Sequence, residues 1–275
     1  MSVTIRSNIS SLSAQNSLSQ TENALSSSLA KLSSGMRITS ASDDAAGLGI
    51  SMDLESDVAS YNQAARNAND GISVAQTAEG ALNEVTNIVT RLRELAMESA
   101  SDGVGDTQRG YINTEATQLT GEIDQIANST EYNNTKLLNS TSTTLDFQVG
   151  IRNDANNDVI SVTSVDATSA TLFGGTIDLS TKTGAQAALD TLDTALDAVA
   201  SASATFGAVS NRLNSAVNTI QSASQNLSAA DSRIRDVDVA AETSNMSRLQ
   251  VLAQAGVSVL AQANQEPQIA LKLLQ

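Results

Sequence analysis

The 275-residue sequence contains no cysteine and no histidine. Without these side chains the chain can form no disulfide, no zinc site with Cys or His ligands, no Cys nucleophile and no His-based catalytic triad. A chain without cysteine also suits a protein that must never cross-link.

Aromatic residues are also scarce, at 2% of the chain with no tryptophan, and the single proline is Pro267. An interior without large rings must be filled by Ala, Leu, Ile and Val, which suits narrow seams between helices better than a thick globular centre. Residues 1–266 contain no proline that would break a helix. The composition therefore favours helices packed along narrow seams.

The chain has few basic residues: it contains 30 acidic and 15 basic residues, so its formal net charge is −15. Nucleic acid and anionic membranes both need a basic surface, so neither is an expected partner. No run of ~18 apolar residues predicts a membrane span, and the N-terminus lacks the apolar region of a secretory signal. The sequence predicts a cytoplasmic protein, or one exported by a route that needs no cleaved signal.

Apolar residues recur every three or four positions in several parts of the chain, which is the spacing of one helix face. The first part covers about residues 4–35 and is rich in Ser and Asn, so this helix should be marginal when alone. The stretch "SSGMRITSASDDAAGLGIS" (33–51), with three glycines, interrupts the pattern. Further helical patterns run from Val58 to Ala96, from Ile112 to Ile126, and from Gly184 toward the C-terminus.

Residues 143–182 differ from the rest of the chain. "TLDFQVGI" alternates apolar and polar residues, "NDANND" reads as a turn and "VISVTSV" returns, which predicts a β-hairpin. Further irregular or short β structure is expected around "LFGGTIDLS", and "NSTEYNNTKLLNSTSTT" before the hairpin is expected to be a loop.

These patterns predict a mainly α fold. It would be an elongated antiparallel helical bundle or coiled coil, formed by the N- and C-terminal segments, with a small central β-hairpin insert. Long helices with narrow apolar stripes must pair, or the stripes stay in water. After pairing once, the terminal helices would still expose apolar surface, which predicts self-association.

Three segments then carry a resemblance. "SLAKLSSGMRITSASDDAAGLGIS" (28–51), "RNANDGISVAQTAEGALNEVTNIVTRLRELAMESA" (66–100) and "VLAQAGVSVLAQANQEPQIALKLL" (251–274) resemble bacterial flagellin, the flagellar filament subunit. The likeness covers residues 1–140 and about 185–275, with the motifs in the right order. The central part is short, which implies a form without large outer domains.

The resemblance implies a division of the chain. Residues 1–34 with 245–275 would form an inner coiled-coil core that folds on assembly, and residues 35–52 with 230–244 a connecting spoke. Residues 53–142 with 184–229 would form an outer core helical domain, and 143–183 its short β-hairpin insert. The residues expected to make the inner-core assembly contacts are Ile5, Ile9, Leu12, Leu18, Leu25, Leu29, Leu32, Leu249, Leu252, Val259, Leu260, Leu271 and Leu274.

The spoke contains charged residues that are candidates for ion pairs. Arg37, Asp43 and Asp44 are expected to pair with the "SRIRDVD" segment, through Arg233, Arg235, Asp236 and Asp238. Exposed pairs of this kind are worth only ~0–1 kcal/mol each. The alternative of a metal or acid–base pair at Asp43-Asp44 is weighed against an N-cap for a helix opening at Ala45 plus an arginine ion pair, and the cap is favoured.

Two further motifs each allow a structural and a functional interpretation. "DANND" (154–158) begins like a calcium loop, but Val159 and Val165 occupy the positions of the required Gly and Glu, so a hairpin turn is favoured. By resemblance, Arg91, Leu95 and Glu115 match a patch that a Toll-like receptor reads on some flagellins. A contact between neighbouring subunits is the favoured interpretation of this patch.

The resulting hypothesis is a structural subunit, with no enzyme activity, cofactor or metal, that self-assembles into an extracellular flagellar filament for motility. Export would follow the type III route, and the implied partners are copies of itself, an export chaperone, hook-associated junction and cap proteins, and a Toll-like receptor. The alternatives are a hook–filament junction protein, a secreted enzyme on a helical stalk, or a monomeric secreted effector or adhesin. The enzyme cannot use an H-E-x-x-H motif, because the chain lacks histidine.

Overall fold

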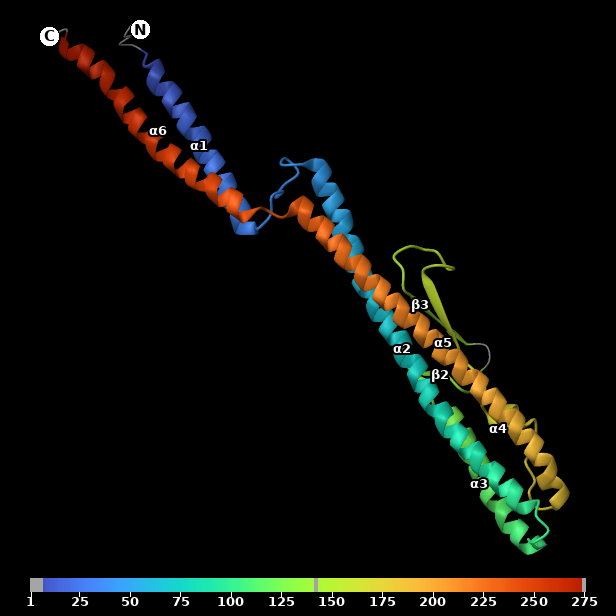
Figure 1. The fold of residues 1–275 in the computed structure, drawn as a ribbon. Coiled ribbons are helices and arrows are strands. Elements are labelled where there is room, and N and C mark those ends of the chain that lie inside the picture. The colour runs from blue at the N-terminus through green and yellow to red at the C-terminus, as the bar shows by residue number, and fades with distance from the viewer. Residues whose placement is uncertain (1–6, 141–142, 274–275) are drawn as a thin grey trace. The chain divides into compact units, whose positions relative to one another are not determined.

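The computed structural model describes residues 7–140 and 143–273, with side chains described as far as Gln265. The described residues form six helices and two small antiparallel sheets (Figure 1). The helices are α1 (Ile9–Ser34), α2 (Ala45–Ser99), α3 (Asp106–Ser129), α4 (Ser169–Phe173), α5 (Lys182–Arg235) and α6 (Val239–Leu273); the strands are β1 (Glu131–Tyr132), β2 (Thr135–Lys136), β3 (Thr144–Gln148) and β4 (Val159–Thr163). The mainly helical fold with a small β insert is confirmed.

The chain divides into two compact units. The terminal unit comprises the chain up to Ser56 and from Asn226 onward, and the central unit is Asp57–Gln225. The division falls within α2 and within α5, so each of these helices contributes to both units.

The central unit has a hydrophobic core between α2, α3 and α5. Its largest fully buried side chains include Leu82 and Leu92 of α2, Ile123 of α3, and Leu192 and Phe206 of α5. Small residues such as Ala68, Ala78, Ala116 and Ala195 are buried beside them, as expected for helices that approach closely in a chain with few aromatics.

A buried arginine holds the turn between α2 and α3. Arg109 is 8% exposed. Its Nε donates to the carbonyl of Ser99 at 2.9 Å and its Nη2 to the carbonyl of Ser101 at 2.9 Å. The last carbonyls of a helix have no partner within the helix, and here the guanidinium supplies one. The ion pair with Asp106 at 3.0 Å adds little, because that carboxylate is almost fully exposed.

The predicted β-hairpin is confirmed and packs on α2. β3 and β4 pair in antiparallel register, with Leu145 opposite Val162 and Phe147 opposite Ile160. A Cβ added to Gly71 of α2 would lie 3.1 Å from the Phe147 ring. The glycine therefore leaves the space in which Phe147 packs on the helix.

Two sequence expectations around the hairpin are wrong in detail. The expected loop "NSTEYNNTKLLNSTSTT" (128–144) contains the tight β1–β2 hairpin, whose turn residues Asn133 and Asn134 have φ values of 46° and 66°. Asparagine tolerates this left-handed region, which a two-residue hairpin turn requires. In "LFGGTIDLS" (172–180) no short β structure forms: Leu172 and Phe173 end the short helix α4, which is capped by Gly174 with φ 65°, and the expected irregular structure follows it.

Replacing Arg109 tests the turn between α2 and α3. Arg109→Gln leaves the buried Ser99 carbonyl and the partly exposed Ser101 carbonyl without their charged donor, so we expect the free energy of unfolding to fall by about 2–3 kcal/mol. Urea denaturation followed by circular dichroism measures this. Arg212→Gln, the same change at an exposed α5 position, is the control and should shift stability by less than about 0.5 kcal/mol. Equal stabilities of the two variants would contradict the assigned role of Arg109.

Candidate functional site

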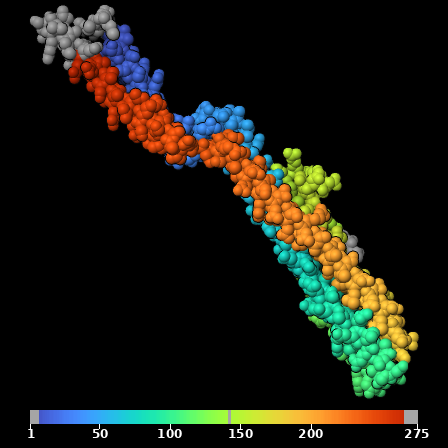
Figure 2. Space-filling model, in the orientation of Figure 1, coloured from blue at the N-terminus to red at the C-terminus, as the bar shows by residue number. Residues whose placement is uncertain are grey.

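The terminal unit is built on an antiparallel pair of helices, α1 and α6. Asn8, which caps α1 by accepting from the Ser11 amide at 3.0 Å, also donates to the carbonyl of Ala263 at 2.8 Å. At the other end of the pair, the Ser28 hydroxyl donates to the Glu242 carboxylate. The space-filling view shows the surface of α1 lying directly against that of α6 (Figure 2).

The two helices meet along a seam with a strict heptad repeat. Its residues are less exposed than those around them and alternate in steps of three and four, the pattern of a coiled coil. In α1 they are Ser11, Ala14, Leu18, Thr21, Leu25, Ser28 and Leu32; in α6 they are Glu242, Met246, Leu249, Ala253, Gly256, Leu260 and Ala263. Several of these positions are small or polar, so the seam is shallow.

The predicted inner-core residues divide into two sets. Leu18, Leu25, Leu32, Leu249 and Leu260 lie on the seam. The second set remains exposed after pairing, by 45–70%, and consists of Ile9, Leu12, Leu29, Leu252 and Val259. Ile5, Leu274 and the side chain of Leu271 lie outside the described residues.

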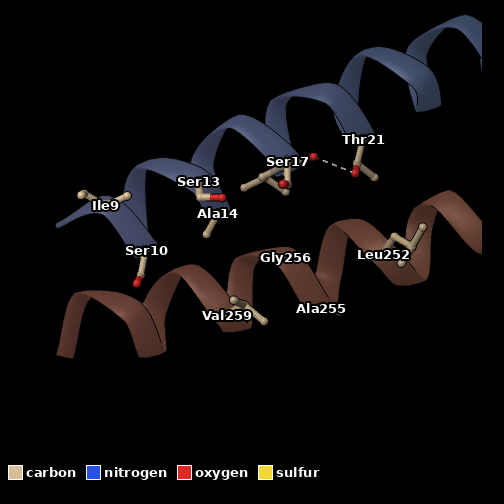
Figure 3. Close-up of a pocket in the computed structure, with 11 residues that line it drawn as sticks. Ile9, Ser10, Ser13, Ala14, Ser17, Thr21, Leu252, Ala255, Gly256 and Val259 are labelled. Carbon is tan, nitrogen blue, oxygen red and sulfur yellow. Dashed lines mark hydrogen bonds between the residues drawn. The ribbon is translucent and has the colours of Figure 1, made fainter. Parts of the chain in front are cut away.

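Part of the exposed set lines a groove between the two helices (Figure 3). The groove has a volume of about 580 Å³ and runs beside the seam. α1 contributes Ile9 and small residues that include Ser13 and Ser17, while α6 contributes Leu252 and Val259. Small and aliphatic side chains on both walls form a surface that an apolar ridge of matching shape can fill.

The links that join this helix pair to α2 and α5 are hydrogen-bonded to each other. The Arg37 amide donates to the carbonyl of Arg235 at 2.6 Å, and the Val237 amide donates to the carbonyl of Gly35 at 3.0 Å. Gly35 has φ 72°, a conformation that glycine adopts without strain. The two links therefore pair as a short antiparallel bridge.

The ion pairs expected between these links are absent from the described residues. The Arg37 guanidinium donates instead to the carbonyl of Ile234 at 2.6 Å, because the last turn of α5 presents carbonyls that lack helical partners. Arg235 pairs with Glu55 at 3.0 Å, and the buried Ser51 donates to Asp231 at 2.5 Å. Arg233 is exposed, while Asp236 pairs through its backbone with Met36.

The paired aspartates have local roles. Asp44 accepts from the Gly47 amide at 2.9 Å, which confirms the predicted N-cap of α2. Asp43 accepts from the Thr39 hydroxyl at 2.9 Å and from the Thr39 and Ser40 amides at 3.1 Å. These bonds, led by that of the Thr39 hydroxyl, hold the pKa of Asp43 below its ordinary value. Asp238 caps α6 in the same way, through the Ala240 and Ala241 amides.

The central unit brings Arg91 and Glu115 together. Arg91 pairs with Glu115 at 2.9 Å and with Glu94 at 3.0 Å, all on the exposed face of α2 and α3. Leu95 is only 2% exposed and belongs to the hydrophobic core. The surface at this position is therefore formed by the charged groups, with Leu95 beneath them.

The described part of the chain shows neither a candidate metal site nor a candidate membrane span. No group of three or more acidic side chains within it is arranged to hold a metal ion. None of the helices found there is long and apolar enough to cross a membrane. The geometry thus defines a class of protein: a helical structural chain whose two ends pair with each other and leave an unfilled apolar groove.

Comparison with known proteins identifies the family. The model of the bacterial flagellin N-terminal helical region matches residues 5–143, and that of the bacterial flagellin C-terminal helical region matches residues 189–274. A flagellin of Halalkalibacterium halodurans is 41% identical over 98% of this chain and 99% of its own length. A flagellin of Xenorhabdus nematophila is 44% identical over the whole of both chains.

A solved structure agrees with this match. The crystal structure of Bacillus cereus flagellin has a TM-score of 0.51 and 31% identity, and the match covers 60% of this chain and 94% of that one. The chain therefore belongs to the bacterial flagellin family, and it is a structural subunit of the flagellar filament.

Acidifying the protein tests the Asp43 loop. Because the pKa of Asp43 is lowered in the folded chain, its contribution is complete above the unfolded-state pKa and is lost as pH falls through the lower folded value. We expect the NMR amide signals of Thr39 and Ser40 to move together only as the pH falls below the ordinary aspartate pKa of about 3.9. Asp43→Asn should remove this titration, whereas Asp53→Asn, at an exposed position nearby, should leave it intact. Titration of both amides in Asp43→Asn would show that another group controls the loop.

Proposed function

We propose that this flagellin assembles by burying between copies the groove and the predicted inner-core residues that stay exposed, which are Ile9, Leu12, Leu29, Leu252 and Val259. The observation that supports the proposal is that Ile9, Leu252 and Val259 stay exposed at the groove after the two helices have paired. Soluble monomers rarely leave such clustered apolar surface uncovered. A repeated heterologous contact of one subunit with the next then builds an open-ended helical polymer.

The energetics favour folding of the ends on assembly. α1 is rich in Ser and Asn, which are poor helix formers, and its seam with α6 is shallow. Pairing within one molecule therefore gives little to offset the entropy of ordering. Each exposed aliphatic side chain that becomes buried between copies adds roughly 1.5–3 kcal/mol, repeated along the polymer.

The parts of the chain would then have separate roles. Residues 1–34 with 245–275 form the inner core, and 35–52 with 230–244 form the spoke, which includes Arg37, Asp43, Asp44, Arg233, Arg235 and Asp236. Residues 53–142 with 184–229 form the outer core, and 143–183 form its hairpin insert. The paired links, the groove and the separate core of the central unit support this division.

Arg91 and Glu115 are proposed as a contact between neighbouring outer-core domains, with Leu95 supporting them from below. Their exposed ion pair favours this role, since charged groups at a rim tune specificity. Recognition of the same patch by a Toll-like receptor is the second candidate.

The remaining assignments complete the proposal. The subunit is exported by the flagellar type III route, acts outside the cell in motility, meets an export chaperone and the junction and cap proteins, and has no enzyme activity. The hook–filament junction protein is less well supported, because the relatives that match the whole chain are flagellins. A monomeric effector would show no concentration-dependent sedimentation.

Replacing an apolar wall residue tests the groove. Val259→Ser removes aliphatic surface without altering the seam, so we expect the critical concentration for polymer growth to rise about tenfold, equivalent to about 1.4 kcal/mol. Sedimentation and negative-stain imaging measure it. The matched control is Val251→Ser, which makes the same change on α6 at an exposed position that does not line the groove. Equal effects of both changes would show that the groove has no special part in assembly.

Salt provides an independent test of assembly. The central unit carries 20 acidic and 8 basic side chains, which accounts for 12 of the 15 net negative charges. Subunits must therefore overcome mutual repulsion, which salt screens over a Debye length of about 30 Å at 0.01 M and about 8 Å at 0.15 M. We expect polymer growth, followed by light scattering, to accelerate across this range, while a neutral osmolyte of equal osmolarity does not reproduce the effect. Slower growth in salt would instead mean that ion pairs dominate the contact.

A further inference from the structure

We propose that the Ser28–Glu242 hydrogen bond and the contact of Leu18 with Gly256 together set the register in which α1 pairs with α6. This inference deepens the proposed function, because the assembly groove exists only in one register. Ser28 is 2% exposed near the end of the seam that adjoins the links, and its hydroxyl donates to the Glu242 carboxylate. A buried polar pair in a coiled coil is well suited to specify register.

Local contacts keep Glu242 ready for this bond. The Ser28 hydroxyl, with the Asn245 amide at 3.2 Å and Lys31 nearby, holds the pKa of Glu242 below its ordinary value. The carboxylate is therefore ionised at neutral pH and accepts the hydroxyl proton strongly. Leaving Ser28 without this partner would bury an unsatisfied hydroxyl.

The apolar residues alone permit a slide in one direction. Both seams repeat every seven residues, so a slide of one heptad replaces Leu18 over Gly256 with Leu25, an identical side chain. The same slide brings Leu249 beside Ser28 in place of Glu242. Loss of the Ser28–Glu242 bond thus opposes this direction, together with loss of the Asn8–Ala263 bond and of the backbone bridge between Gly35 and Val237.

The opposite slide is opposed by shape. A Cβ at residue 256 would lie 3.1 Å from the Leu18 Cδ1, so Leu18 occupies space that only glycine leaves open. Sliding this way sets Leu18 against Leu249 and seats Ser11 over Gly256. The first pairing repeats the Leu–Leu contact that Leu25 makes in the native register, but the void left at Gly256 costs stability. The two contacts therefore block opposite directions.

The consequence for assembly is geometric. A one-heptad slide moves α1 by about 10 Å along α6. In the direction that the Ser28–Glu242 bond opposes, Asn16 takes the place of Ile9 in the groove wall and Gln20 takes the place of Ser13. The groove would lose its apolar end, and the larger Gln20 would narrow it at the place of Ser13. A subunit in the wrong register would then present a surface that its neighbours do not fit.

Disulfide mapping tests the register directly, because the chain has no cysteine of its own. The native reporter is Ser11→Cys with Asn264→Cys, since these side chains are hydrogen-bonded at 2.7 Å. The reporter of the slid register is Gln15→Cys with Ala263→Cys. In the native register Asn8 contacts Ala263, and after a slide of one heptad residue 15 takes the place of Asn8. Each pair is placed in the full-length chain, with trimethylamine oxide present to favour the compact state.

We expect wild-type seams to cross-link only through the native reporter. Ser28→Ala with Glu242→Leu should switch cross-linking to the slid reporter and raise the critical concentration for polymer growth at least about tenfold. Ser28→Thr with Glu242→Gln, which keeps donor and acceptor, should retain the native cross-link. Ser27→Ala with Glu22→Leu, at exposed α1 positions, is the matched control and should also retain it.

The outcomes separate the register from the assembly groove. Persistence of the native cross-link in Ser28→Ala with Glu242→Leu would overturn the proposed register role, whatever happens to assembly. A switched cross-link with unchanged polymer growth would uphold the register role and refute the groove as the assembly surface. Absence of the native cross-link in the otherwise unaltered chain would overturn both contacts as determinants of register.

Discussion

The pairing of α1 with α6 is the contact on which the terminal unit depends. Its strict heptad spacing would normally give a stable coiled coil, but many seam positions carry Ser, Thr, Ala or Gly in place of Leu or Ile. Small seam residues let the helices approach closely and bury little apolar area. The pair is therefore specific in geometry and weak in energy. That combination suits a subunit that must be passed through export and then become rigid.

The central unit differs from the terminal unit because its helices bury most of their apolar residues against one another. Its α2, α3 and α5 bury a continuous set of aliphatic side chains, and polar groups such as Arg109 close the turns at its ends. This unit has its own core and does not need neighbours to cover it. One chain thus combines a self-sufficient folded body with ends whose remaining apolar surface is available to other copies.

The sequence predicted the long helices and the β3–β4 hairpin because their apolar periods are sustained. It could not sort the terminal apolar residues by face, for a physical reason. Counting Leu and Ile alone misses Ser11, Thr21, Ser28 and Gly256, which occupy seam positions, and so merges the seam with the exposed set. The sequence pattern also could not show which acceptor a long side chain would reach. Arg37 donates to the Ile234 carbonyl and not to a carboxylate. The Asn133-Asn134 turn was signalled by two adjacent residues that tolerate positive φ.

The bridge between the two links has a mechanical meaning. Gly35 and Val237, like Arg37 and Arg235, are joined across the two chain segments by backbone hydrogen bonds. Neither segment can bend or twist alone without breaking them. A pulling force on either link is therefore shared by both segments through these backbone hydrogen bonds.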